Sequence, residues 1–268
     1  MTLSEAVLEI VAGRPGTFGV YARNLATDET ISVNADRVLP AESAAKTFIL
    51  IHYSRLVTAG TVDPTTRVCL GQDLRQIGTG VLRYLADGLE PTLDDLAWLM
   101  IIVSDNTATA MLLQAIGEPA DVNDTMASLG YPTARLNETI TLETALDGEP
   151  FSTCSPRDLA EVFTELDERG TAMLFRQQHL IGLSRKLPAM SQAVDVGVTM
   201  PVRIFNKTGN GIGNFIDSGL FETDEASWVI AAMAAEQPDF AARPDDMAPA
   251  TFADIGELIY AAWGLSDQ

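Results

Sequence analysis

The position of the strand-like segments constrains this fold most: they lie at the two ends of the chain, with a long helical stretch between them. Residues 17–39 alternate between apolar and polar and turn at residues 27–29, which predicts a β-hairpin. Three more strand-like segments, separated by glycine or acidic turns, occupy residues 202–236. If the two groups join, they form one antiparallel sheet of about five strands, with an all-α lobe inserted between the second and third strands.

The helical segments complete the predicted fold. Apolar residues recur at helical spacing in 4–13, 43–59, 92–104, 106–117, 120–130, 155–170 and 251–263. We therefore expect an α+β protein, an α/β sandwich whose sheet is flanked by the N- and C-terminal helices. The 268 residues are expected to form a single catalytic domain, with an α/β lobe at 1–42 and 195–268 and a helical lobe at 43–194.

Charge and composition exclude several kinds of partner. The net charge of −20 argues against nucleic acid or an anionic membrane, and no apolar run is long enough to span a bilayer. No basic region precedes an apolar one at the N-terminus, which predicts a cytoplasmic protein, or a secreted or periplasmic one whose leader was removed. Cys69 and Cys154 both lie in apolar surroundings, so two free buried thiols are favoured over a disulfide.

A serine and a lysine stand one helical turn apart in a small, apolar run. Ser43 and Lys46 lie in "LPAESAAKTFIL", and residues at i and i+3 share one face of a helix. A serine hydroxyl becomes a good nucleophile when a neighbouring base takes its proton, and burial favours the neutral amine of lysine. The pair is therefore a candidate nucleophile and base, although a lysine that only extends from a helix face would give the same pattern.

Two further motifs change this interpretation. Ser-Asp-Asn at residues 104–106 lies between two helical segments, and Lys-Thr-Gly at 207–209 ends a predicted strand. The three motifs use two of the chain's three lysines. In their order and spacing they resemble the penicillin-recognising serine hydrolases, which include class A β-lactamases and D-Ala-D-Ala peptidases. The resemblance extends from the hairpin near Gly19 to the C-terminal helix.

The resemblance implies a catalytic role for three of these residues. Ser43 would be the acylated nucleophile and Lys46 its activating partner. Ser104 would pass a proton to the amide nitrogen that leaves.

The resemblance also implies substrate-binding residues. Asn106 would hydrogen-bond the acylamino side chain of the substrate, while Lys207 and Thr208 would attract and bind its carboxylate. Gly209 would let the strand approach the substrate closely. The backbone N–H of Asn210 would complete an oxyanion hole with that of the nucleophile.

One element of the class A pattern is missing. These enzymes carry Glu-x-x-Leu-Asn in the loop that activates water, and this string is absent from residues 133–156. By position, Glu138 is the best candidate for the base and Glu143 the second, although either can be a solvated loop carboxylate. The strand after the third motif carries Asp217 and no arginine; Arg203 could replace that arginine if it shares the face of Lys207.

The resemblance therefore implies a class A β-lactamase-like serine hydrolase that acts on a small molecule through an acyl-serine. Hydrolysis of the β-lactam would be slow if no carboxylate replaces the missing glutamate. A D-Ala-D-Ala peptidase, a small-ester hydrolase and a non-catalytic penicillin-binding sensor remain as alternatives. We expect no cofactor and no metal, because no clustered histidines and cysteines occur. His52 and His179 are expected to pack helices or lie on the surface; the oligomeric state is left open.

Overall fold

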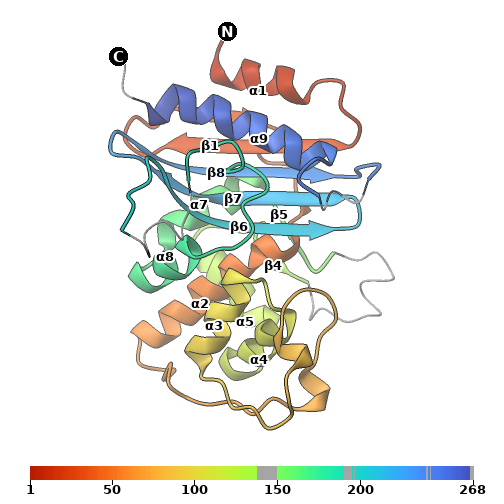
Figure 1. The fold of residues 1–268 in the computed structure, drawn as a ribbon, viewed down its shortest axis with the longest axis vertical. Helices are drawn as coiled ribbons and strands as arrows, with labels where there is room; N and C mark the ends of the chain where they lie inside the picture. Colours follow the sequence, from red (N-terminus) through yellow and green to blue (C-terminus); the bar gives the residue numbers. More distant parts are fainter. Residues whose placement is uncertain (138–149, 190–194, 196, 240, 242, 266–268) are drawn as a thin grey trace.

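A five-stranded antiparallel sheet forms the centre of the computed structural model (Figure 1). The structure describes all residues except 138–149, 190–194, 196, 240, 242 and 266–268. The strand order is β2-β1-β8-β7-β6, so the two groups of predicted strands do join. The strands are β1 (Thr17–Asn24), β2 (Thr30–Val33), β6 (Arg203–Gly211), β7 (Asn214–Glu222) and β8 (Ser227–Ala235).

The first and last helices cover one face of this sheet. Helix α1 (Leu3–Val11) packs beside α9 (Met247–Ile259), and Figure 1 shows both above the strands. Phe252 of α9 contacts Phe18 and Phe215, with ring centroids 6.4 and 5.3 Å away. Aromatic pairs at this separation add to the energy of apolar burial. This layer therefore holds β1 and β7 in one sheet although they come from opposite ends of the chain.

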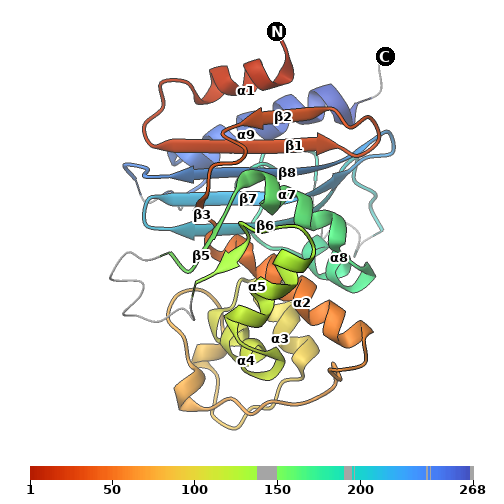
Figure 2. The ribbon, with the colours of Figure 1, turned by 180° about the vertical axis from the view of Figure 1, so that it is seen from behind.

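The remaining helices lie on the other side of the sheet and below it. Figure 2 shows α7 across the face of the sheet opposite α9, with α2 to α5 beneath. Every residue of α2 from Lys46 to Ser54 is buried, so this helix is enclosed on all sides by the others. The helices are α2 (Lys46–Thr58), α3 (Leu93–Ile102), α4 (Asn106–Ile116), α5 (Pro119–Ser128), α7 (Pro156–Glu161) and α8 (Glu168–Phe175).

The prediction of one continuous helix over 155–170 is wrong. Helix α7 passes into a short 3-10 segment, Val162–Glu165, and α8 begins separately. The side chain of Asp167 accepts a hydrogen bond of 2.8 Å from the backbone N of Gly170. An aspartate in this position is a strong helix N-cap, so it starts a second helix where apolar periodicity alone indicates a continuous one.

The prediction that the inserted segment is all-α is also wrong. Strands β3 (Leu39–Pro40), β4 (Arg135–Leu136) and β5 (Ser152–Cys154) form a small antiparallel sheet. Both cysteines are free, but only Cys154 is buried, whereas Cys69 is exposed. Among the described residues, no helix has the length and hydrophobicity needed to cross a bilayer. The lobe boundaries given above stay a prediction.

Candidate active site

Ser43 lies in a tight turn between the small sheet and helix α2. The turn is a 3-10 segment, Glu42–Ala45, and the α-helix begins only at Lys46, so the predicted helix start at Ser43 is three residues early. Hydrogen bonds hold the turn: Ala41 N donates to Ser152 O at 2.9 Å, and Ala44 N donates to Ala41 O at 3.1 Å. Ser43 itself is partly exposed, so a substrate can reach it.

Lys46 is fully buried at the first turn of α2 and reaches the second motif. Its Nζ donates to the backbone O of Ser104 at 2.7 Å and to Asn106 Oδ1 at 2.7 Å, and lies 3.0 Å from Ser104 Oγ. None of the hydrogen bonds among the described residues joins this amine to the Ser43 hydroxyl. The first and second motifs thus meet directly, through the lysine.

Ser104 is the point where both lysines of the motifs converge. The Nζ of Lys207 lies 3.1 Å from Ser104 Oγ. Ser104 has a φ of 55°, in the left-handed region that residues other than glycine seldom adopt. Thr79 Oγ1 donates to the backbone O of Ser104 at 2.7 Å. A strained residue held by its neighbours in this way is typical of functional sites.

Asp105 fixes the loop that precedes the inserted helices. Its Oδ1 accepts from Ala108 N at 2.9 Å and caps α4, while its Oδ2 accepts from Val81 N at 2.6 Å and Leu82 N at 2.9 Å. A Cβ at Gly80 would lie 2.2 Å from Asp105 Cγ. The glycine therefore allows the loop to lie directly against the second motif.

The amide of Asn106 is already engaged on both sides. Its Oδ1 accepts from Lys46, as described above, and its Nδ2 donates to the backbone O of Ile77 at 2.8 Å. A substrate amide that binds Asn106 must therefore replace or share the contact with Ile77.

The third motif lies on the edge strand β6, pressed against the turn that carries Ser43. The Nζ of Lys207 also donates to Thr208 O at 2.8 Å. A Cβ at Gly209 would lie 2.9 Å from Ser43 N and 2.7 Å from Ala41 O, which leaves no room for a side chain. Glycine at this position thus brings β6 into contact with the Ser43 turn, with Asn210 one residue further along the strand.

Burial lowers the pKa of both lysines of the site. Burial and the charge of Lys207 hold the pKa of Lys46 well below its ordinary value. Burial also lowers the pKa of Lys207 to about 7, although the nearby carboxylate of Asp217 raises it. Burial raises the pKa of Asp217 to about 7, although this carboxylate accepts hydrogen bonds from Asn206 Nδ2 at 2.9 Å and Leu183 N at 2.8 Å. A neutral lysine beside Ser104 can accept a proton, which an ammonium cannot.

The two histidines differ from each other. His52 packs helices as expected, with its Nδ1 2.7 Å from Thr125 Oγ1. His179 follows helix α8, which ends at Phe175. Burial and the charge of Lys207 lower the pKa of His179, which also makes a hydrogen bond with the backbone of Val103. No sequence signal placed this histidine near the lysines.

The three other sequence-based candidates have different outcomes. Glu138 and Glu143 lie outside the described residues. The segment that contains them starts and ends close to the Ser43 turn, since Asn137 N donates to Phe151 O at 2.9 Å and Ser152 pairs with Ala41. Arg203 forms an ion pair with Glu222 on the next strand at 3.0 Å.

No cluster of three or more histidine, cysteine or acidic side chains suited to a metal occurs among the described residues.

Fold and site together define a class of protein: an α+β serine hydrolase with the layout of class A β-lactamases. The family model for the β-lactamase enzyme family matches residues 2–263. The chain therefore belongs to this family.

Individual relatives agree with the family match. A carbapenem-hydrolyzing β-lactamase KPC of Klebsiella oxytoca is 30% identical over 155 residues, 56% of this chain and about half (52%) of that enzyme. A β-lactamase structure from Sphaerobacter thermophilus is 30% identical, with a TM-score of 0.83 over 99% of this chain and 98% of that one. A mutant of PBP-A in an acyl-enzyme complex with penicillin G is 25% identical, with a TM-score of 0.84 over 97% and 95% of the two chains.

Proposed function

We propose that this chain opens β-lactams by forming an acyl-enzyme on Ser43 and then hydrolyses that ester. The observation that carries the proposal is the convergence of Lys46 and Lys207 on Ser104 Oγ, at 3.0 and 3.1 Å, beside the turn that holds Ser43. One hydroxyl between two buried amines can take up a proton on one side and release it on the other.

In the proposed acylation the Ser43 hydroxyl must come within hydrogen-bond reach of Lys46 Nζ, because none of the hydrogen bonds among the described residues joins the two groups. The Ser43 oxygen attacks the lactam carbonyl carbon while its proton passes to neutral Lys46. The backbone N–H groups of Ser43 and Asn210 stabilise the negative charge that develops on the carbonyl oxygen. The C–N bond then breaks, and the amide nitrogen takes the proton of Ser104, which is replaced from the lysines. Lys207 and Thr208 bind the substrate carboxylate.

Deacylation needs a carboxylate that takes a proton from water as the water attacks the ester. Glu138 is the proposed base and Glu143 the alternative, both in the segment whose ends lie at the Ser43 turn. Because the Glu-x-x-Leu-Asn string is absent, this step is expected to limit turnover. The likeness to a PBP-A mutant seen as an acyl-enzyme with penicillin G favours a second candidate function: a penicillin-binding peptidase that holds its adduct.

Intact-protein mass spectrometry after mixing with benzylpenicillin tests the proposal. Wild-type protein should gain the mass of one penicillin and lose it again within a multiple-turnover experiment. Glu138→Ala should acylate at a similar rate and keep the adduct, with Glu143→Ala as the matched control. If only Glu143→Ala keeps the penicillin adduct, Glu143 is the base instead. An adduct that persists for hours in wild-type protein would contradict β-lactam turnover, and D-Ala-D-Ala peptides and small esters would then identify the substrate.

A further inference from the structure

Glu42 stands directly before the nucleophile and belongs to none of the three motifs. Its φ is 48°, so it is one of the few non-glycine residues with a left-handed backbone. Such a conformation costs free energy and persists only where surrounding contacts maintain it. The backbone O of Glu42 accepts a hydrogen bond from Ser152 Oγ at 2.9 Å, which accounts for the turn but not for the choice of glutamate.

The side chain of Glu42 contacts the turn between β6 and β7. Its Oε1 accepts a hydrogen bond of 2.9 Å from Nδ2 of Asn214, the first residue of β7. A Cβ at Gly211 would lie 2.5 Å from that oxygen and 2.8 Å from the Glu42 Cδ. The absence of a side chain at Gly211 is therefore what allows the carboxyl group to reach the turn.

This contact links the two segments that carry the proposed oxyanion hole. One N–H belongs to Ser43, the residue after Glu42, and the other to Asn210, the residue before Gly211. The hydrogen bond between Glu42 and Asn214 ties these segments together across the edge of the sheet. Within the three motifs, Gly209 packs against the Ser43 turn, and the contacts of Lys46 and Lys207 with Ser104 join the same two segments on the other side of the site.

We propose that Glu42 is a positioning residue that, through Asn214, fixes the separation of the two oxyanion-hole N–H groups. The proposal rests on the proposed function, because it assigns those N–H groups to the developing oxyanion. Stabilisation of an oxyanion depends on donors placed at 2.7–3.1 Å from the position the oxygen will occupy. A strand edge that shifts by a fraction of this distance weakens one donor and leaves the other intact.

The positioning role predicts which replacement rescues the site. Glutamine at position 42 keeps an oxygen that can accept from Asn214 and removes the carboxylate charge, whereas alanine removes the acceptor. Burial raises the pKa of Glu42, so a neutral acceptor suits this environment at least as well as a charged one. We therefore expect Glu42→Gln to behave like the wild type and Glu42→Ala to be impaired.

The experiment compares Glu42→Ala, Glu42→Gln, Asn214→Ala and the double variant Glu42→Ala/Asn214→Ala. Glu222→Ala, at the far end of the same strand pair, is the matched control. Two quantities are measured: the acylation rate constant with benzylpenicillin and the affinity for phenylboronic acid. A boronic acid forms a tetrahedral adduct with an active serine, so its affinity reports on the oxyanion hole even if penicillin is not the substrate.

Loss of a whole oxyanion donor costs about 10²–10³ in rate, so a displaced donor should cost about tenfold. Glu42→Ala and Asn214→Ala should each lose this factor in acylation and in boronic acid affinity, with the non-covalent Kd for penicillin almost unchanged. The double variant should be no worse than either single one. Glu42→Gln should stay within about threefold of wild type.

Three outcomes would overturn the proposal: wild-type acylation in Glu42→Ala, an equal loss in Glu42→Gln, or a lower rate without a lower boronic acid affinity. If Glu42→Ala fails to fold, Asn214→Ala tests the same hydrogen bond from its other end. Wild-type protein that binds boronic acid but forms no penicillin adduct would instead refute the proposed substrate, and the boronic acid comparison would still decide the role of Glu42.

Discussion

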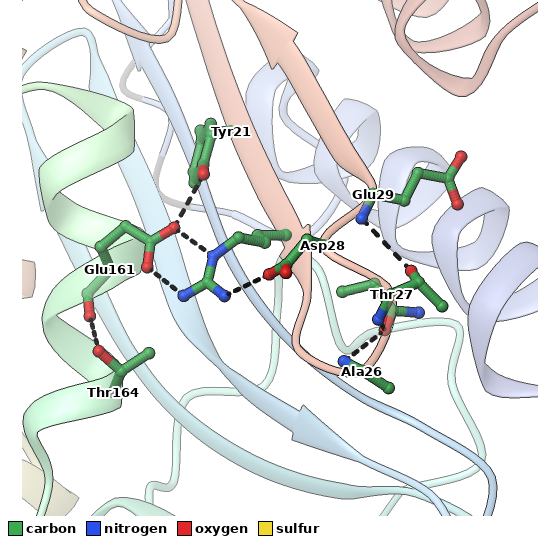
Figure 3. A network of polar contacts seen from close by, with 9 residues as sticks. Tyr21, Ala26, Thr27, Asp28, Glu29, Glu161 and Thr164 are labelled. Atoms are coloured by element: carbon green, nitrogen blue, oxygen red, sulfur yellow. Dashed lines mark hydrogen bonds and ion pairs between the residues drawn. The ribbon is translucent and has the colours of Figure 1, made fainter.

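Two polar clusters join the central sheet to the helices beneath it, and they are built in opposite ways. The serine–lysine cluster, Lys46, Ser104 and Lys207, is buried and brings two amines to one hydroxyl. The tyrosine–glutamate cluster consists of Tyr21, Arg23 and Glu161. There, Arg23 donates to the Glu161 carboxylate at 2.8 and 2.6 Å. The Tyr21 hydroxyl donates to the same carboxylate at 2.8 Å (Figure 3).

The charges in the two clusters explain their different consequences. In the tyrosine–glutamate cluster opposite charges meet. Burial alone would raise the pKa of Glu161, but hydrogen bonds from Arg23 and Tyr21 lower it, so its charged form is favoured. In the serine–lysine cluster, burial and mutual repulsion disfavour the charged form of Lys46. The tyrosine–glutamate cluster stabilises the fold. The serine–lysine cluster lowers stability but keeps amines that can accept protons.

The largest expected effect is the loss of the adduct in Ser43→Ala. No other serine has both a lysine in the next turn and the third-motif strand against its backbone, so penicillin labelling should disappear completely. Intact mass spectrometry with benzylpenicillin measures it, and melting temperature shows whether the fold is retained. Labelling that persists on another residue would show that Ser43 is not the nucleophile. The serine–lysine cluster would then not be the reactive cluster of the two.

Lys46→Ala should slow acylation by about 10²-fold or more, the usual contribution of a positioned acid–base group. Stopped-flow mixing with a chromogenic cephalosporin gives the rate constant. Lys186→Ala is the matched control, because this third lysine is exposed and paired with Asp254 and Glu257 at 2.8 and 2.7 Å. An unchanged rate in Lys46→Ala would show that the buried lysine only supports the structure.

Lys207→Met should flatten the pH dependence of stability between about pH 7 and 10. The pKa of Lys207 is about 7 in the folded protein, but its ordinary value, about 10.4, applies in the unfolded chain. In that interval the unfolded chain binds more protons, so the free energy of unfolding rises with pH. One proton corresponds to a slope of about 1.4 kcal/mol per pH unit in the free energy of unfolding. This is the most by which the loss of the Lys207 amine itself can reduce that slope.

Urea unfolding at several pH values measures this slope. In Lys207→Met, the pKa of Asp217 should rise further because a nearby cation is gone, which lowers the slope in the same direction. Lys186→Ala again serves as control. Equal slopes in wild type and Lys207→Met would mean that Lys207 keeps its ordinary pKa, and the contrast between the two clusters would then be lost.

Much of this architecture could be predicted from the sequence, because it depends on local patterns and on motif order. Alternation predicted the five strands of the central sheet, and the motifs indicated that residues 43–46, 104–106 and 207–209 come together. The break between α7 and α8 could have been found from Asp167, a strong N-cap inside an apolar pattern.

The remaining features depend on contacts between distant residues, which periodicity does not encode. Ser104, with its left-handed backbone, is contacted by Thr79, Lys46 and Lys207, all distant from it in the sequence. The contact of Glu42 with Asn214 spans most of the chain, and His179 lies near the lysines only because the segment after α8 returns to Val103. The exposure of Cys69 likewise reflects tertiary packing, not its apolar neighbours in the sequence.

The smallest expected effect lies in the tyrosine–glutamate cluster. Glu161→Ala should destabilise the protein by about 1–2 kcal/mol, since it removes a partly buried acceptor of charged hydrogen bonds. The side chains of Arg23 and Glu161 are 25% and 18% exposed, so solvent screens the pair and keeps the effect small. A double-mutant cycle with Arg23→Ala should give a coupling of about 1 kcal/mol in urea unfolding.

This stabilisation should also fade in acid. The pKa of Glu161 is lowered in the folded protein, so its contribution is present above the ordinary pKa of glutamate, about 4.3, and is lost as pH falls through the folded value. Acylation of Glu161→Ala at neutral pH should equal that of wild type. If acylation falls along with stability, the two clusters are coupled through the sheet, and the division between a reactive cluster and a stabilising one is wrong.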